Sequence, residues 1–288
     1  MNEMSDRLRL VSDQLETLTQ IESVMSAMQG IASARRSEAQ TSLEGIKSYA
    51  STIAKSIGIT LAAIASKGES IKTENTSASE LVIALSAEQG FAGAYNERLL
   101  DVAIDHVNSE PKSQLVIVGN RGQMIAGNRQ VKVFDSLPMA TRVQAIPALA
   151  NELVDTLYTH LNHEQFTRVR LIYPLIHKAN TVDIIKRSLL PFDYSKFELP
   201  ESLNPPLFNL EATTLLTKLA TEYIYSELCQ ALVLAHAAEN EERIRAMVRA
   251  RSNIRNSRTR LTVDFQQLRQ EQITAEITEL TTGRISRH

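Results

Sequence analysis

The sequence has 288 residues, of which 43% are hydrophobic, and a formal net charge of −2. This composition excludes a disordered chain, and the near-neutral charge gives the whole protein no general attraction for nucleic acid. The single cysteine, Cys229, excludes an intrachain disulfide framework and suits a reducing compartment. The polar N-terminus does not resemble a signal peptide, and no apolar run reaches the roughly 18 residues of a membrane span. We therefore expect membrane contact only through a partner.

The first predicted element is a helix from about Ser5 to Ile64, with Ser5 as its N-cap. Proline is absent from residues 1–66, and apolar side chains recur with a strict seven-residue period. This period predicts a left-handed coiled coil over residues 1–66. The stripe consists of Leu8, Val11, Leu15, Leu18, Glu22, Met25, Gln29, Ala32, Arg36, Ala39, Leu43, Ile46, Ala50, Ile53, Ile57, Thr60 and Ile64.

The middle of the chain, residues 78–206, alternates short apolar runs with helical segments, which predicts a Rossmann-like α/β domain with a largely parallel sheet. The last two strands are expected to form a hairpin joined at residues 178–180. The predicted elements are strands at 81–86 and 131–136, a strand followed by a glycine-containing turn within 114–122, helices at 96–107 and 141–161, and hairpin strands at 168–177 and 181–191.

The chemistry-bearing residues of this region are sparse. Gly90 and Gly93 follow the first strand, but the middle glycine of a dinucleotide fingerprint is missing, and no phosphate loop with its lysine is present. We interpret these glycines as tight-turn residues rather than a ligand site. His160 and His163 are read as a surface pair rather than a metal site, and Cys229 as a small core residue. No metal or other cofactor is predicted.

The last segment, residues 207–288, predicts a second coiled-coil helix from about Glu211 to Thr282, again without proline. The fold class is therefore α+α/β: a long antiparallel coiled coil of N- and C-terminal helices with a central Rossmann-like domain. Polar residues interrupt both stripes, and they either fix the register or mark places where the seam loosens inside other proteins. The second stripe consists of Leu216, Leu219, Tyr223, Ser226, Gln230, Val233, Ala237, Asn240, Ile244, Met247, Arg251, Ile254, Arg258, Leu261, Phe265, Leu268, Gln272 and Ala275.

Positive charge concentrates between Glu239 and Arg260, where seven arginines face three glutamates and the local net charge is +4. One interpretation is a solvated basic face, and the other is a face that meets acidic loops of a surrounding partner. Nucleic acid is disfavoured because the segment has no aromatic residue on which bases could stack.

Three segments resemble the gamma subunit of F-type ATP synthases, in the same order along the chain. Near the C-terminus, RQEQITAEITELTTG is similar to the family signature. The N-terminal segment SVMSAMQGIASARRSEAQ and the strand-turn LSAEQGFAGAYN are also similar. The matching residues are Arg269, Gln270, Ile273, Thr274, Glu276, Glu279 and Gly283; Ala27, Met28, Ile31, Ala32 and Arg35; and Gly90, Gly93 and Asn96.

This resemblance implies a non-catalytic central stalk that rotates inside a ring of alpha and beta subunits and couples ion flow to ATP chemistry on beta. It also implies contacts with the epsilon subunit and the c-subunit ring, no nucleic acid, and a peripheral location at the cytoplasmic face of the bacterial inner membrane. A static coiled-coil scaffold with an α/β head is the alternative. The residues expected to contact the alpha/beta ring are Met25, Met28, Arg35, Arg251, Arg255, Arg258, Arg269, Gln270, Thr274, Glu276 and Glu279.

The chain also departs from the family pattern. Ala94 follows Gly93 where the family has glycine, Arg284 follows Gly283 where a small residue is typical, and the tail ends in the polar RISRH. Glu22 occupies a seam position that is often rich in lysine or threonine. These departures suggest a divergent branch, for which the alternative sodium-type ATPases are a candidate.

Overall fold

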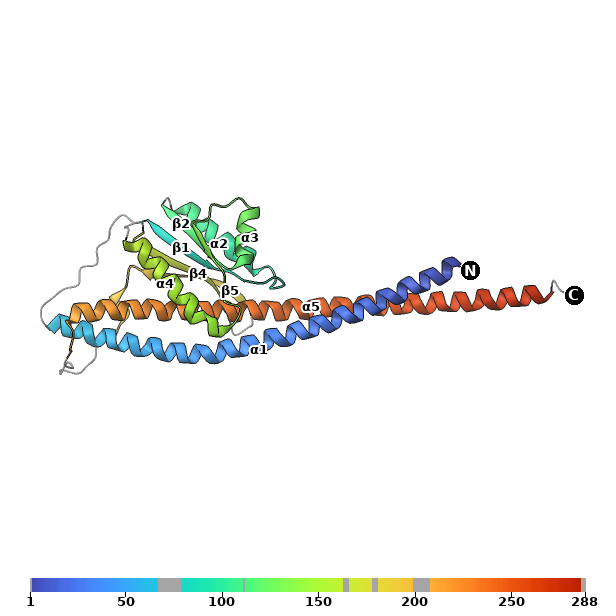
Figure 1. Cartoon of the computed structure of the whole chain (residues 1–288), viewed down its shortest axis with the longest axis horizontal. Coiled ribbons are helices and arrows are strands. Elements are labelled where there is room, and N and C mark those ends of the chain that lie inside the picture. Colours follow the sequence, from blue (N-terminus) through green and yellow to red (C-terminus); the bar gives the residue numbers. More distant parts are fainter. Residues whose placement is uncertain are drawn as a thin grey trace. The chain divides into compact units, whose positions relative to one another are not determined.

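A computed structural model describes residues 2–66, 79–110, 112–162, 166–177, 181–198 and 208–285. Among these residues, no helix combines the length and the apolar character needed to cross a membrane. Figure 1 shows the elements in chain order. They are α1 (Asn2–Ser66), β1 (Glu80–Leu85), α2 (Tyr95–Ser109), β2 (Ser113–Val118), α3 (Asn120–Asn128), β3 (Asp135–Leu137), η1 (Val143–Ala145), α4 (Ile146–Asn162), β4 (Arg168–Ile176), β5 (Val182–Leu190), η2 (Tyr194–Lys196) and α5 (Ala212–Ile285).

The two long helices are confirmed. Every stripe position of α1 is buried or half-buried, and so is every stripe position of α5 except Ala275. The seven-residue period therefore marks the packed face of both helices. The prediction that Ser5 caps α1 was wrong, because the helix already includes Asn2 and Ser5 lies within it.

The chain divides into two compact units whose boundaries fall inside both helices. We call residues 1–32 with 244–288 the terminal unit, and residues 33–243 the sheet unit. This division does not test the predicted domain limits of 1–66, 78–206 and 207–288, which stay a prediction.

The sheet unit contains five strands in the order β3-β2-β1-β4-β5. β1 pairs in parallel with β2 and β4, β2 pairs in parallel with β3, and β4 and β5 form the predicted antiparallel hairpin. The mixed, largely parallel α/β sheet is therefore confirmed. Residues 178–180, where the hairpin was expected to turn, lie outside the described residues.

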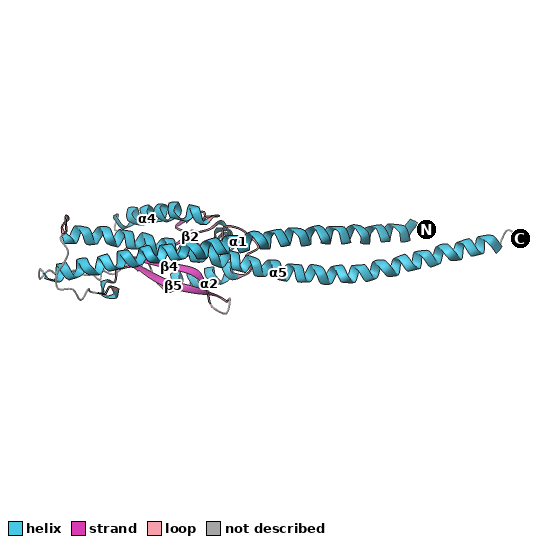
Figure 2. Cartoon of the chain, turned by 90° about the horizontal axis from the view of Figure 1, so that it is seen from below, coloured by secondary structure: helices cyan, strands magenta, loops and turns pink. Residues whose placement is uncertain are grey.

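Alternate side chains of the strands build two cores, one on each face of the sheet. On one face, Leu81 and Ile83 of β1 share a core with α4, with Ala39 of α1 and with residues 224–237 of α5. On the other face, Val82 and Ala84 pack against α2 and α3. Figures 1 and 2 show α1 and α5 running side by side next to the sheet in this unit. Parts of α1 and α5 thus share a core with the α/β layer, by which we mean β1–β5 together with α2, α3 and α4.

Three local predictions need correction. Residues 114–122 were predicted as a strand that ends in a glycine-containing turn, but the strand ends at Val118 and the helix α3 begins at Asn120; glycine has low helix propensity, and Gly122 and Gly127 therefore give this helix no clear signal in the sequence. The third strand was predicted at 131–136, but only Asp135–Leu137 pairs with β2. The helix predicted from residue 141 begins with the short η1, and α4 starts at Ile146.

The C-terminal end of α1 and the N-terminal end of α5 meet in an aromatic cluster. Phe192 stacks on Phe197 with ring centroids 5.4 Å apart, and Tyr223 of α5 lies edge-on to both rings. Ile57 of α1 and Leu216 of α5 are buried in the same cluster. The chain around η2 therefore joins the two helices.

Candidate functional site

The polar interruptions of the two stripes pair with each other in the terminal unit. Glu22 of α1 accepts hydrogen bonds from Arg255 at 2.8 Å and Arg258 at 2.9 Å, and Arg251 donates to the side chain of Gln29 at 2.9 Å. The partners run in opposite directions along the chain, so the helices are antiparallel here. The hydrogen bond from Arg255 lowers the pKa of Glu22. This pairing favours the register interpretation over a loosened seam.

The sheet unit shows the same antiparallel relation between α1 and α5. Arg36 forms an ion pair with Glu241 at 2.5 Å, and the hydroxyl of Tyr49 donates to Glu222 at 2.6 Å. Asn240 behaves differently from the other interruptions, because its amide donates to the carbonyl oxygen of His236 in the same helix.

The predicted ring-contact residues divide into three sets. Met25 and Met28 are half-buried in the terminal unit, and Arg35 is half-buried in the sheet unit. Arg251, Arg255 and Arg258 belong to the polar pairs, although the side chains of Arg255 and Arg258 remain 59% and 43% exposed. Arg269, Gln270, Thr274 and Glu276 are exposed along α5, and the side chain of Glu279 lies outside the described residues.

The outer faces of the terminal unit carry exposed apolar side chains between polar ones. Of the 13 large hydrophobic residues that are exposed among the described side chains, eight lie in this unit. Exposed arginines, Arg249 and Arg260, accompany them on α5. Isolated exposed hydrophobics are common, but this concentration on a two-helix rod is typical of a surface that meets a partner. The eight are Leu10, Ile21, Val24, Ile31, Val248, Val263, Ile273 and Ile277.

The glycine-containing turn after β1 has a different backbone from the one predicted. Gly93 has a positive φ of 65°, as expected of a turn glycine. The other positive φ in this turn, 58°, belongs to Phe91, whose side chain is 66% exposed. Gly90 is not among the residues with positive φ.

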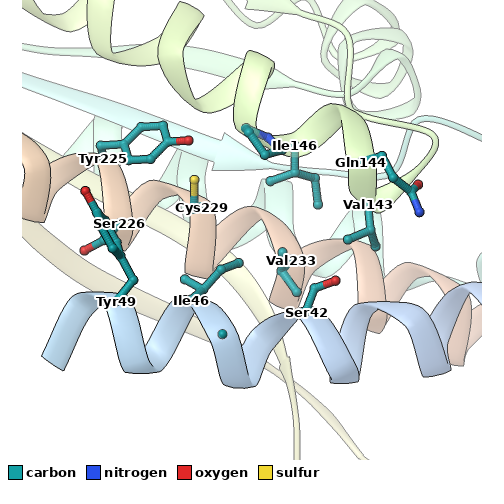
Figure 3. Close-up of a pocket in the computed structure, with 12 residues that line it drawn as sticks. Ser42, Ile46, Tyr49, Val143, Gln144, Ile146, Tyr225, Ser226, Cys229 and Val233 are labelled. Atoms are coloured by element: carbon teal, nitrogen blue, oxygen red, sulfur yellow. The ribbon is translucent and has the colours of Figure 1, made fainter. Parts of the chain in front are cut away.

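The sheet unit contains a cavity of about 350 Å³. Its lining side chains come from α1, η1, α4 and α5 (Figure 3). Its lining is mainly apolar and includes Gly45 and Ile46 of α1, Ile146 of α4, and Tyr225 and Cys229 of α5. Cys229 is buried, as predicted, and burial raises the pKa of its thiol. A neutral thiol is a poor nucleophile, so the cavity offers no evident covalent chemistry.

The described ranges contain no group of three His, Cys, Asp or Glu side chains placed to hold a metal ion. His163 and the side chain of His160 lie outside these ranges, so their reading as a surface pair stays a prediction.

Sequence reasoning missed a buried polar cluster on α5. Glu239 and Arg243 are 4% and 5% exposed and form an ion pair at 2.6 Å, and Asn240 between them is fully buried. An i,i+4 pair on a charged helix reads as a surface feature, and nothing local distinguishes this one. Arg243 is one of the seven arginines between Glu239 and Arg260, and because it is buried it does not belong to an exposed basic face.

His236, next to this cluster, makes the stability depend on pH. Burial lowers its pKa to about 4 from the ordinary 6.5. Arg35 and Arg243 act in the same direction, whereas a hydrogen bond with the backbone of Ala140 and the charge of Glu38 oppose them. Because the unfolded chain then binds a proton that the folded chain refuses, stability should fall as the pH drops from about 6.5 to about 4.

We expect the variant His236→Gln to lack this loss. At pH 4 the free energy of unfolding of the unsubstituted chain should have fallen by about 3 kcal/mol relative to the variant, with pH 7.5 as the baseline. Urea unfolding at a series of pH values measures the difference, in which the carboxylate titrations cancel. Parallel stability curves for the two chains would contradict the assignment.

Comparisons with known proteins agree with this architecture. A family model described as ATP synthase matches residues 7–285. The ATP synthase gamma chain of Clostridium pasteurianum is 24% identical over 284 residues, which cover 97% of this chain and 98% of that protein. The ATP synthase gamma chain of Brevibacillus brevis is 25% identical over 291 residues, with 97% and 98% covered.

Solved structures share the fold at lower identity. A chain of the Euglena gracilis mitochondrial ATP synthase rotor in rotational state 1 has a TM-score of 0.61 and 14% identity, and the match covers 93% of this chain and 99% of that one. A chain of the OSCP/F1/c-ring assembly from the same organism has a TM-score of 0.64 and 15% identity, with 99% and 95% covered. The predicted fold class is thereby confirmed.

Proposed function

Because the chain belongs to the ATP synthase family, we propose that it is the gamma-type central stalk of an F-type ATP synthase, coupling ion flow through a membrane ring to ATP synthesis or hydrolysis by rotation. The observation that carries the proposal is the match to the family over residues 7–285, in a fold with two long, antiparallel terminal helices. A static scaffold is not favoured, because the curated relatives, which this chain matches along nearly their whole length, are ATP synthase gamma chains.

The stalk would act without a catalytic site of its own. Its contribution is mechanical: a rod whose sides differ in apolar and charged residues favours a different state of each catalytic site as it turns. This is coupling between distant sites through alternative global states, and it requires that the rod contact each state differently. ATP would bind to the beta subunits.

The proposed partners are those expected of a gamma subunit, and the exposed residues of the terminal unit support one of these contacts. The terminal unit, with its exposed apolar side chains and arginines, would lie inside the ring of alpha and beta subunits. The sheet unit would contact the epsilon subunit and the c-subunit ring, and through them reach the cytoplasmic face of a bacterial inner membrane. The ring contacts proposed are Met25, Met28, Arg35, Arg251, Arg255, Arg258, Arg269, Gln270, Thr274, Glu276 and Glu279.

Co-purification and single-molecule rotation test this function. A tagged chain should bring down alpha and beta subunits with ATPase activity, and its failure to do so would refute the proposal. The single native cysteine is buried, so a probe can be attached at Lys132→Cys, an exposed position of the α/β layer. We expect ATP-driven rotation of the probe, whereas a stationary probe on an active complex would favour the scaffold.

Arg269→Ala and Gln270→Ala should each slow ATP-driven turnover while the complex still assembles. Both side chains are exposed on α5, so their loss should not unfold the helix. We expect about a fivefold decrease in turnover, which corresponds to about 1 kcal/mol of lost contact energy. ATPase assays of the purified complex measure it, with the equally exposed neighbour Glu271→Ala as the matched control. Equal turnover in all three variants would show that these two positions make no functional contact.

A further inference from the structure

The turn after β1 lies where α/β folds usually bind a ligand. The strand order changes direction at β1, with β2 and β3 on one side and β4 and β5 on the other. Open α/β sheets hold ligands in the crevice at the carboxyl ends of the strands at such a switch point. Backbone amides of the turn commonly bind an anion there.

In this chain two side chains of α5 occupy the turn. The carboxylate of Glu239 lies 3.3 Å from the amide nitrogen of Glu88 and 3.5 Å from that of Gln89 and accepts a hydrogen bond from each. The guanidinium of Arg243 donates to the carbonyl oxygens of Gln89 and Gly90, both at 3.3 Å. The carboxylate thus stands where a bound anion would, and the backbone is held through both its donors and its acceptors.

Apolar side chains pack around these hydrogen bonds between α5 and the turn. Ala238, adjacent to Glu239 in α5, is fully buried with Ala87, Ala92 and Tyr95 of the turn region. Small side chains on both partners let the helix approach the turn closely. The backbone amide of Ala87 donates to the side chain of Asn96 in α2 at 2.9 Å, so the turn is also held by the helix that follows it.

The hydrogen-bond network extends from the turn into the rest of the α/β layer. The carboxylate of Glu88 accepts hydrogen bonds from the backbone amides of Asn120 at 3.2 Å and Met139 at 2.7 Å. It therefore holds the N-terminus of α3 and the segment after β3, while its own backbone amide is held by Glu239. A continuous path of hydrogen bonds leads from α5 to α3.

We infer that Glu239 and Arg243 lock the α/β layer onto α5 by filling the switch-point crevice, and that they are positioning residues through which torque passes between the two. This rests on the proposed rotor function. Removing one partner of a buried, hydrogen-bonded ion pair leaves the other charge uncompensated and weakens the attachment strongly. The shared apolar core would still hold the layer on α5, but the turn after β1 would move against the helix under load, so less torque would be transmitted while catalysis on the ring continues.

The test compares ion pumping with ATP hydrolysis in the complete complex reconstituted into lipid vesicles. Glu239→Ala and Arg243→Ala should lower the ratio of ATP-driven ion translocation to ATP hydrolysis by about fivefold or more. The control Asp101→Ala removes a solvent-exposed pair with Arg129 in the same layer and should leave the ratio unchanged. A proportional fall of pumping and hydrolysis, or an unchanged ratio in both lock variants, would overturn the inference.

Chemical rescue adds a readout that a merely structural role would not move. Formate is a small carboxylate that fits the space vacated in Glu239→Ala, and we expect it to restore the ratio in this variant but not in Arg243→Ala. Restoration in neither variant, or equally in both, would contradict the lock.

Hydrogen exchange keeps the inference testable if the variants fail to assemble. In the unsubstituted complex, the amides of Glu88 and Gln89 should exchange slowly, and exchange at the rate of an open loop would refute the lock. The outcomes remain distinguishable from a failed rotor function, in which the unsubstituted chain itself would bring down no alpha and beta subunits.

Discussion

Replacing Gly119 with alanine should lower the free energy of unfolding by about 3 kcal/mol. Gly119 follows β2 with a φ of 110°, a conformation that side chains other than glycine rarely adopt. An added Cβ would lie 2.5 Å from the carbonyl oxygen of Ser86 and 2.8 Å from that of Ala87. Both neighbours belong to backbone that cannot rotate away, so the turn after β1 itself would have to move.

Gly127→Ala is the matched control for this effect. Gly127 lies in α3 of the same layer, and an added Cβ there would meet no atom within 4 Å. Alanine favours helix over glycine by up to about 1 kcal/mol, so this variant should be neutral or slightly more stable. Urea unfolding of the two purified variants measures the difference. Similar stabilities for both would show that the turn after β1 accommodates a side chain at position 119.

The periodic parts of this chain were predictable because their physics is local. The seven-residue stripe of α1 depends only on which side chains face a partner, and each of its positions is buried or half-buried as expected. The β4–β5 hairpin was equally predictable, because two strand-like segments rich in apolar residues are separated by a short connection. By contrast, α3 is only nine residues long and contains Gly122 and Gly127, which have low helix propensity. Its sequence therefore gives little sign of a helix, and packing against the sheet stabilises it.

The candidate site could be predicted from the sequence only in part. The polar interruptions were visible in the sequence, but the pairing of Glu22 with Arg255 and Arg258 depends on the relative register of segments more than 230 residues apart. The contact of Glu239 with the turn after β1 spans about 150 residues and has no local marker. Exposed motifs such as Arg269–Gln270 can be recognised by resemblance, whereas internal locks require the fold.

Gly58 and Gly45 provide a second comparison, within the helix α1. An added Cβ at Gly58 would lie 2.1 Å from the carbonyl oxygen of Glu198, in the segment that follows η2. Gly45, 13 residues earlier, borders the cavity of Figure 3, and a Cβ there would meet nothing within 4 Å. The two glycines share a helix and a residue type and differ mainly in what lies against them.

We expect Gly58→Ala to destabilise the chain by about 2 kcal/mol, because the cost of displacing backbone exceeds the gain of up to about 1 kcal/mol in helix propensity. Gly45→Ala should instead stabilise it by up to about 1 kcal/mol, since only the propensity changes. Urea denaturation of both variants gives the two free energies. If Gly58→Ala proved as stable as Gly45→Ala, the segment after η2 would not pack against α1, and the joint that the aromatic cluster forms between the two helices would be looser than the structure indicates.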